Sequence, residues 1–184
     1  PVALHAQEGK QKDIIGDMKI IYGIEAYYVN EADSLSVVRG SSAEPLTGTF
    51  IVFDLETTGL NPASEEITEI AAVRVTDGAI QDSFQTYVNP HKPIPEEITK
   101  LTGISDETVA AAPALGEAVP QFLAWAGEGQ YPLVAHNAGF DMGFLRTACK
   151  RLAIERDFTA IDTLEMSRLM LPHLHKFKLN ILAK

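Results

Sequence analysis

The stretch that decides the fold runs from Phe50 to Leu60 and reads Phe-Ile-Val-Phe-Asp-Leu-Glu-Thr-Thr-Gly-Leu. Its first half is a run of β-branched and aromatic residues, which is typical of a buried strand. Two acids, Asp54 and Glu56, interrupt the run near its end. Because residues two positions apart in a strand point to the same face, we expect the two carboxylates to stand side by side.

Two like charges held this close repel each other and lose hydration, which costs free energy unless a cation lies between them. The pair therefore predicts a metal site. An exposed edge strand whose outward face is acidic is the alternative, and this stretch alone leaves both open. The turn that follows, Thr57-Thr58-Gly59, leads the chain away, and Gly59 permits a close approach of the backbone.

The composition of the 184 residues is that of one well-packed domain with room for an appended fragment. No apolar run approaches the ~20 residues that span a bilayer, and no signal peptide is visible, so we expect no membrane partner. The single Cys149 excludes an internal disulfide and a multi-cysteine zinc site, and it fits a cytoplasmic setting. The net charge of −10 argues against binding nucleic acid by bulk charge, but it leaves open binding through metal ions.

The pattern along the chain predicts strands first, and then strands that alternate with helices. Asp77-Gly78 between two apolar runs is a strong β-hairpin signal. The expected strands cover the opening stretch, 67–76, 79–88, 131–135 and 159–161, and the expected helices cover 96–101, 106–110 with Ser105 as N-cap, 115–125, 138–152, a segment from Asp162 to Pro172 and one starting at Phe177. This order predicts a mixed α/β sheet with helices packed against it, and ligands gather at strand ends in such sheets.

A second acidic feature follows the fourth expected strand and reads His136-Asn137-Ala138-Gly139-Phe140-Asp141. Asn137 is a natural N-cap, and Asp141 lies in the first helical turn, where the helix dipole favours a carboxylate. That structural role alone would explain Asp141. The combination of two acidic strand ends in one α/β unit favours a ligand role instead.

Three segments together resemble a known family. Phe53-Asp54-Leu55-Glu56-Thr57-Thr58-Gly59 and the segment from His136 to Leu145 resemble the first and second motifs of the DEDD-type 3′–5′ exonucleases, and Leu101-Thr102-Gly103-Ile104 resembles a signature of the proofreading branch. The resemblance runs from about Thr49 to Lys184. It implies a ribonuclease-H-like fold, in which three antiparallel strands are followed by parallel strands and flanked by helices.

The family removes nucleotides one at a time from 3′ ends with two divalent metal ions. By position, the resemblance implies that Asp54, Glu56 and Asp141 are catalytic metal ligands, and such hard oxygen ligands suit Mg²⁺ or Mn²⁺. It implies a single-stranded DNA 3′ end as the partner. The substrate-binding residues that it implies are Thr57, Thr58, Gly59, Leu101, Thr102, Ile104, His136, Asn137 and Phe140.

The region before the exonuclease-like part has a resemblance of its own. The segment from Tyr22 to Tyr27 resembles part of a PHP (polymerase and histidinol phosphatase) domain, in which Glu25 matches a metal-ligand position. A PHP segment joined to an exonuclease resembles the PolC-type replicative polymerases of bacteria, whose remaining regions would be further partners. We therefore predict a PHP fragment over 1–30, a linker over 31–48 and an exonuclease domain over 49–184.

One departure from the family concerns its third motif, a His with an Asp five residues later, which is not found before Lys184. We therefore expect this chain alone to be weak or inactive. We interpret His173 and His175 as exposed loop residues and Asp162 as a helix cap. Glu65, Glu66 and Glu69 are interpreted as a solvated acidic edge. Two alternatives stay open: an RNA-trimming member of the same superfamily, and a non-catalytic module that docks nucleic acid or a partner.

Overall fold

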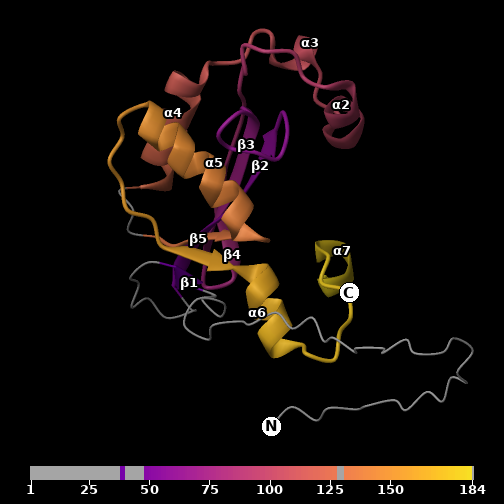
Figure 1. Ribbon diagram of the computed structural model, residues 1–184. Helices are drawn as coiled ribbons and strands as arrows, with labels where there is room; N and C mark the ends of the chain where they lie inside the picture. The colour runs from indigo at the N-terminus through magenta and orange to yellow at the C-terminus, as the bar shows by residue number, and fades with distance from the viewer. Residues whose placement is uncertain (1–37, 40–47, 128–130, 184) are drawn as a thin grey trace, which may run out of the picture.

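The computed structural model describes residues 38–39, 48–127 and 131–183, whose strands form one six-stranded sheet in the order β1-β6-β5-β2-β3-β4 (Figure 1). The central strand β2 pairs antiparallel with β3, which pairs antiparallel with β4. On its other side β2 runs parallel to β5, and β5 runs parallel to β6. The predicted mixed sheet is confirmed. The strands are β1 (Val38–Arg39), β2 (Thr49–Thr57), β3 (Ile67–Thr76), β4 (Ala79–Tyr87), β5 (Leu133–Ala135) and β6 (Ala160–Asp162).

The predicted linker over 31–48 contains one described element, the two-residue strand β1, which pairs antiparallel with β6. The whole PHP-like fragment predicted over 1–30 lies outside the described residues. The division of the chain into three parts therefore stays a prediction.

The hairpin between β3 and β4 forms where the sequence predicts it. Asp77 and Gly78 are its two loop residues, and their φ angles are 50° and 78°. Positive φ at both positions is the requirement of the type I′ turn, which matches the twist of the strands it joins.

The helices begin and end within about two residues of their predicted positions, and two of them, α3 and α6, begin at caps that are readable in the sequence. The Ser105 side chain accepts a hydrogen bond from the N–H of Thr108, and the Asp162 carboxylate accepts from the N–H groups of Leu164 and Glu165. Both predicted caps are confirmed. The helices are α2 (Glu96–Thr102), α3 (Asp106–Val109), α4 (Leu115–Ala126), α5 (Ala138–Arg151), α6 (Thr163–Met170) and α7 (Leu179–Leu182).

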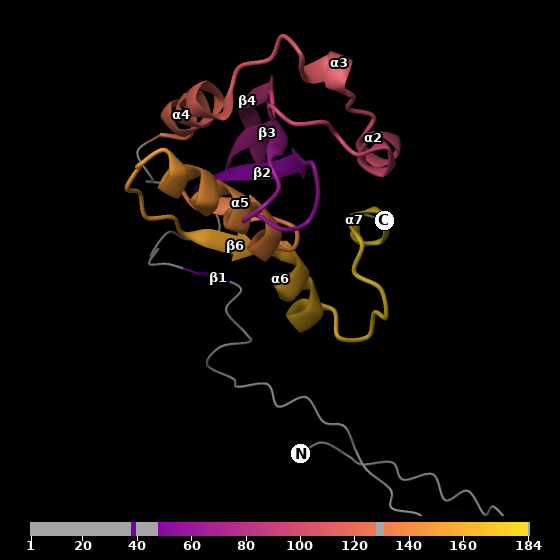
Figure 2. The same cartoon turned by 45° about the horizontal axis from the view of Figure 1, so that its top comes forward.

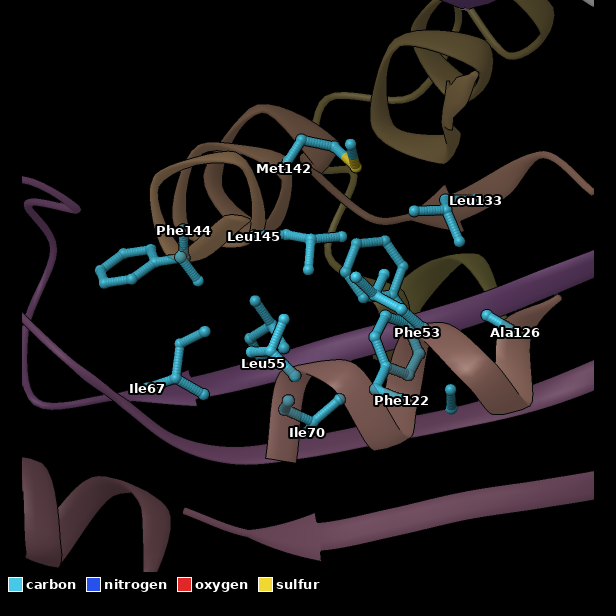
Figure 3. Close-up of a cluster of buried hydrophobic side chains, with 14 of the residues drawn as sticks. Phe53, Leu55, Ile67, Ile70, Phe122, Ala126, Leu133, Met142, Phe144 and Leu145 are labelled. Carbon is cyan, nitrogen blue, oxygen red and sulfur yellow. The ribbon is translucent and has the colours of Figure 1, made fainter. Parts of the chain in front are cut away.

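The main core lies between one face of the sheet and helices α4 and α5 (Figure 3). Strand β2 contributes Ile51, Phe53 and Leu55, all buried, and the ring of Phe53 stacks on that of Phe122 of α4 at a centroid distance of 6.0 Å. Leu145 of α5 packs into the same cluster. The opposite face of β2 is left without this cover.

Helices α2 and α3 form an arm that stands apart from the sheet (Figure 2). The arm has its own small core of Ile94, Ile104 and Val109, separate from the main core. Among the described helices, none is both long enough and apolar enough to cross a membrane.

Candidate active site

The site begins on the uncovered face of β2. The strand alternates, so that Ile51, Phe53 and Leu55 point into the core while Asp54 is exposed and Glu56 is half-buried. The predicted side-by-side placement of the two acids on one face is confirmed. The register of the sheet adds a third acid, because Glu69 of β3 lies directly opposite Glu56.

Burial and repulsion between neighbouring carboxylates raise the pKa values of Asp54 and Glu56. Partial burial, followed by repulsion from Glu69, raises the pKa of Asp54. Partial burial, followed by repulsion from Asp54 and then Glu69, raises the pKa of Glu56. Glu69 is half-buried, so its interpretation as part of a solvated acidic edge stays a prediction, while its position opposite Glu56 adds it to the acids of the site. The strand register that brings Glu69 to Glu56 is a long-range feature, although the alternation of β3 could have indicated its face.

Asp141 approaches the same place from the first turn of α5. Its side chain is 2% exposed, and its Oδ1 accepts a hydrogen bond of 3.1 Å from the backbone N–H of Leu55. This N–H lies beyond the part of β2 that pairs with β5, which ends at Val52. The carboxylate of Asp141 thus satisfies a backbone donor that the sheet leaves unpaired.

Burial, followed by repulsion from Asp54, raises the pKa of Asp141 to about 7, against the opposing effect of the hydrogen bond from Leu55. Asp162 of β6 adds a weaker repulsion. The structure therefore brings together the three acids that the sequence singles out, from two separate elements.

These acids offer hard oxygen donors and no thiolate, which is the donor chemistry that Mg²⁺ and Mn²⁺ prefer. A cation among them would relieve the repulsion that raises their pKa values. As the side chains stand, no three His, Cys, Asp or Glu residues within the described ranges form a group that could hold a metal ion. The type of donor therefore fits Mg²⁺ or Mn²⁺, but the side chains of the described residues do not form a complete set of metal ligands as they stand.

His136 shares an open cleft of about 380 Å³ with Asp54, on the uncovered face of the sheet. Its Nδ1 lies 3.0 Å from the hydroxyl of Thr163, and that hydroxyl donates its hydrogen to the carbonyl oxygen of Ala135 at 3.3 Å. Because the hydroxyl has one hydrogen to give, Nδ1 carries the proton in this arrangement. In the neutral imidazole the other ring nitrogen, Nε2, is then the acceptor.

Asn137 occupies the predicted N-cap position of α5, but for a different reason. Its φ of 66° places it in the left-handed region, and its side chain makes no capping hydrogen bond. The predicted capping role of the Asn137 side chain is therefore wrong. Its backbone N–H instead donates to Oδ1 of Asp162 at 3.1 Å, and asparagine tolerates this conformation better than most residues.

In the turn after Glu56, the threonine side chains form hydrogen bonds with other groups of the protein. The hydroxyl of Thr57 donates to the carbonyl oxygen of Gly59 at 2.6 Å, and the hydroxyl of Thr58 donates to Oε2 of Glu65 at 2.6 Å. Both threonines are buried. The expected contact of Thr57 and Thr58 with a nucleotide stays a prediction, and the structure shows both hydroxyls bonded within the protein. The neighbouring Leu60, 82% exposed, is an apolar side chain at the same turn that the sequence alone did not single out.

The side chains of the signature Leu101-Thr102-Gly103-Ile104, which begins in the last turn of α2, differ in exposure. Leu101 is 80% exposed, whereas Ile104 is 3% exposed and belongs to the small core of the arm. The hydroxyl of Thr102 donates to the carbonyl oxygen of Ile98. The expected contacts of Leu101, Thr102 and Ile104 with the terminal base stay a prediction, and Leu101 has the most exposed side chain of the three. Phe140, half-buried, packs against Phe144 at a centroid distance of 5.1 Å.

Similarities to known proteins agree with this geometry. Residues 51–184 match a family model described as Exonuclease. DNA polymerase III PolC-type of Caldanaerobacter subterraneus is 46% identical over 167 residues, and that of Bacillus subtilis is 41% identical over 170 residues. Each alignment covers 91% of this chain and 12% of the relative, so the chain spans about an eighth of the length of these relatives.

Solved structures share the fold. A product-bound exonuclease I has a TM-score of 0.65 at 18% identity, with 74% of this chain and 38% of that chain covered. Exonuclease X, solved in complex with 5′ overhanging duplex DNA, has a TM-score of 0.55 at 29% identity, with 70% of this chain and 68% of that chain covered. The predicted ribonuclease-H-like architecture is confirmed. With strand-end carboxylates, this fold and a family match over most of its length, the chain belongs to the exonuclease family.

Proposed function

We propose that this chain is the proofreading 3′–5′ exonuclease region of a PolC-type replicative DNA polymerase. In this proposal it hydrolyses the last phosphodiester bond at the 3′ end of single-stranded DNA and releases nucleoside 5′-monophosphates. A bacterial cytoplasmic setting, and the other regions of the polymerase and PHP domain as partners, are parts of the same proposal. The observation that carries it is the convergence of Asp54, Glu56 and Asp141, whose pKa values are raised by burial and by repulsion from neighbouring acids.

In this proposal Asp54, Glu56 and Asp141 would hold the Mg²⁺ or Mn²⁺ ions, two in the complete enzyme. When bound, two such ions activate a water molecule and stabilise the departing oxygen of an in-line displacement. The protein's own contribution is to place the acids. The hydrogen bond from Leu55 holds Oδ1 of Asp141 in place, and the alternation of β2 aims Asp54 and Glu56 at the same side.

The neighbouring groups supply contacts for the substrate. Leu101 on the arm and Leu60 at the turn are exposed apolar side chains suited to stacking against a nucleobase. His136 presents an acceptor nitrogen to the cleft that it shares with Asp54. The Asn137 side chain makes no capping hydrogen bond and stays in the proposed binding set, as do Thr57, Thr58, Gly59, Thr102, Ile104 and Phe140.

The test is an Asp54→Asn variant of the full-length parent protein. We expect release of monophosphates from a labelled single-stranded DNA oligonucleotide, in Mg²⁺ or Mn²⁺, to fall at least about 10³-fold, because several kcal/mol of charge stabilisation are lost. DNA synthesis by the same preparation reports on folding. The control is Asp157→Asn, because Asp157 is exposed and lies away from the cleft.

The same assay separates the alternatives. Faster removal of nucleotides from an RNA oligonucleotide than from DNA would favour an RNA-trimming enzyme. If the parent protein with Mn²⁺ present bound oligonucleotides without shortening them, it would be a docking module. Unchanged hydrolysis by the Asp54→Asn variant would contradict the proposed site.

A further inference from the structure

One carboxylate oxygen links the turn after Glu56 to the segment that leads into the arm. Oε2 of Glu65 accepts a hydrogen bond of 2.6 Å from the hydroxyl of Thr58 and lies 2.8 Å from Nζ of Lys92. The ammonium group of Lys92 also donates to the backbone oxygen of Ser64 at 3.1 Å. We call Thr58, Glu65 and Lys92 the latch.

The latch has a defined geometry on the side of the turn. A Cβ atom on Gly59 would lie 2.9 Å from Cγ of Glu65, so the absence of a side chain there makes room for Glu65. The N–H of Glu66 donates to the Thr58 hydroxyl at 3.0 Å, so this hydroxyl both accepts and donates. Hydrogen bonds from Lys92 and then Thr58 lower the pKa of Glu65, which keeps it charged at neutral pH.

On the other side of the latch stands the arm of α2 and α3. Its base is closed by Asn89, whose N–H donates to the carbonyl oxygen of Pro113 at 2.9 Å and whose side chain donates to that of Ala110 at 3.3 Å. Its apolar contacts are within its own small core. Figure 2 shows that the arm is joined to the sheet at its base and projects beyond it. Lys92 therefore links the segment that leads into the arm to Glu65, which is bonded to the turn that follows the acids of β2.

We propose that Lys92 is a positioning residue for the exonuclease reaction. Through Glu65 it holds the arm, and with it Leu101, at a set distance from Asp54 and Glu56, so that a 3′-terminal nucleotide is gripped between them. The inference rests on the proposed function, since it assigns a task to the same site. An ordinary exposed ion pair would have little effect on binding. The latch differs because its carboxylate also bonds the buried Thr58 directly after the catalytic strand.

The test compares Lys92→Met with Lys92→Arg in the full-length parent protein. For single-stranded DNA we expect Lys92→Met to raise KM about 5-fold and leave kcat within about 2-fold, because the substrate is gripped less well while the acids stay in place. We expect Lys92→Arg to restore KM, since a guanidinium can reach the same two acceptors. Bis(p-nitrophenyl) phosphate, a small ester without a nucleoside for the arm to contact, should be hydrolysed as by the wild type. Arg168→Met, which breaks the exposed pair of Arg168 and Glu165 on α6, is the control.

Amide hydrogen exchange provides a readout that does not depend on activity. Lys92→Met should speed exchange in residues 58–66 and 94–104 and leave β2 and α5 unchanged. An unchanged KM, or a loss of activity on the small ester that equals the loss on DNA, would overturn the positioning role. If the wild type cleaved neither substrate, the proposed function would fail, and the exchange data would still report on the latch.

Discussion

The two faces of strand β2 contribute to stability with opposite sign, although they belong to the same few residues. On one face Ile51, Phe53 and Leu55 are buried against α4 and α5, where each removes apolar area from water and stabilises the fold. On the other face Asp54 and Glu56 stand beside a third acid, and their pKa values are raised. The strand is thus stabilised by its core face and carries an electrostatic cost on its open face.

This contrast indicates where function lies. Structural acids in a folded protein are usually paired or hydrogen-bonded so that their charge is favourable, as Glu65 is by Lys92 and Thr58. Acids that raise one another's pKa without such relief are a pattern found at functional sites. The acids of β2 stay close together despite their repulsion because the apolar side chains on the other face of the strand hold its backbone in place.

The largest effect that separates the two faces should come from truncating neighbouring residues of β2. Ile51→Ala removes a side chain that is 0% exposed and leaves a cavity, so we expect a loss of about 2–5 kcal/mol in the free energy of unfolding. Val52→Ala removes a side chain that is 39% exposed on the open face and should cost under about 1 kcal/mol. Urea unfolding followed by circular dichroism measures both. Equal losses for the two variants would contradict the contrast between the faces.

Much of the fold was predictable from local patterns. The period of two along β2 separates Phe53 from Asp54 correctly, the pair Asp77-Gly78 specifies its hairpin, and Ser105 and Asp162 cap the helices they precede. Each of these signals acts between residues close in sequence. This is why element types and ends were predictable, and why the strand-end acids could be singled out.

The features that the sequence did not yield depend on contacts between distant residues. Glu69 joins the site through the register of two strands, and Ile104 is buried because the arm has a core of its own. Asn137 adopts a left-handed conformation that its capping propensity does not indicate. The tie from Lys92 to Glu65 spans 27 positions, which no local pattern encodes.

The second effect concerns pH and metal. Because burial and Asp54 raise the pKa of Asp141 from 3.8 to about 7, the folded state holds this proton more tightly than the unfolded state does. The contribution of Asp141 to stability is therefore fully present below about pH 4 and is lost as pH rises through about 7, by roughly 4 kcal/mol at most. Asp141→Asn keeps an oxygen that can accept from Leu55 and should remove this loss.

Unfolding measured from pH 4 to pH 8 in a chelator tests this, with the difference between the variant and the wild type as the quantity of interest. We expect Asp141→Asn to become the more stable of the two as pH rises. Adding Mn²⁺ at pH 8 should raise the stability of the wild type and have less effect on the variant, because a bound cation offsets the repulsion. A constant difference across the pH range would show that Asp141 is ionised without cost.

The smallest expected effect concerns Glu69, which lies opposite Glu56 on the open face of the sheet, and it tests directly whether repulsion between acids makes this face costly. Glu69→Gln removes one of the charges that raise the pKa values of Asp54 and Glu56, while its amide oxygen can still accept the hydrogen bond from Gln85. We expect both pKa values to fall, as followed by carbon-13 NMR of the carboxyl groups. The free energy of unfolding at pH 7 should rise by a few tenths of a kcal/mol, as expected for relief of a cross-strand like-charge pair.

Glu155→Gln, which changes an exposed acid outside the cleft, should change neither the pKa values nor the free energy of unfolding. If the pKa values of Asp54 and Glu56 stayed at their wild-type values, repulsion from Glu69 would not be a cause of their shift. The electrostatic cost of the open face would then come from burial and, for Glu56, from Asp54.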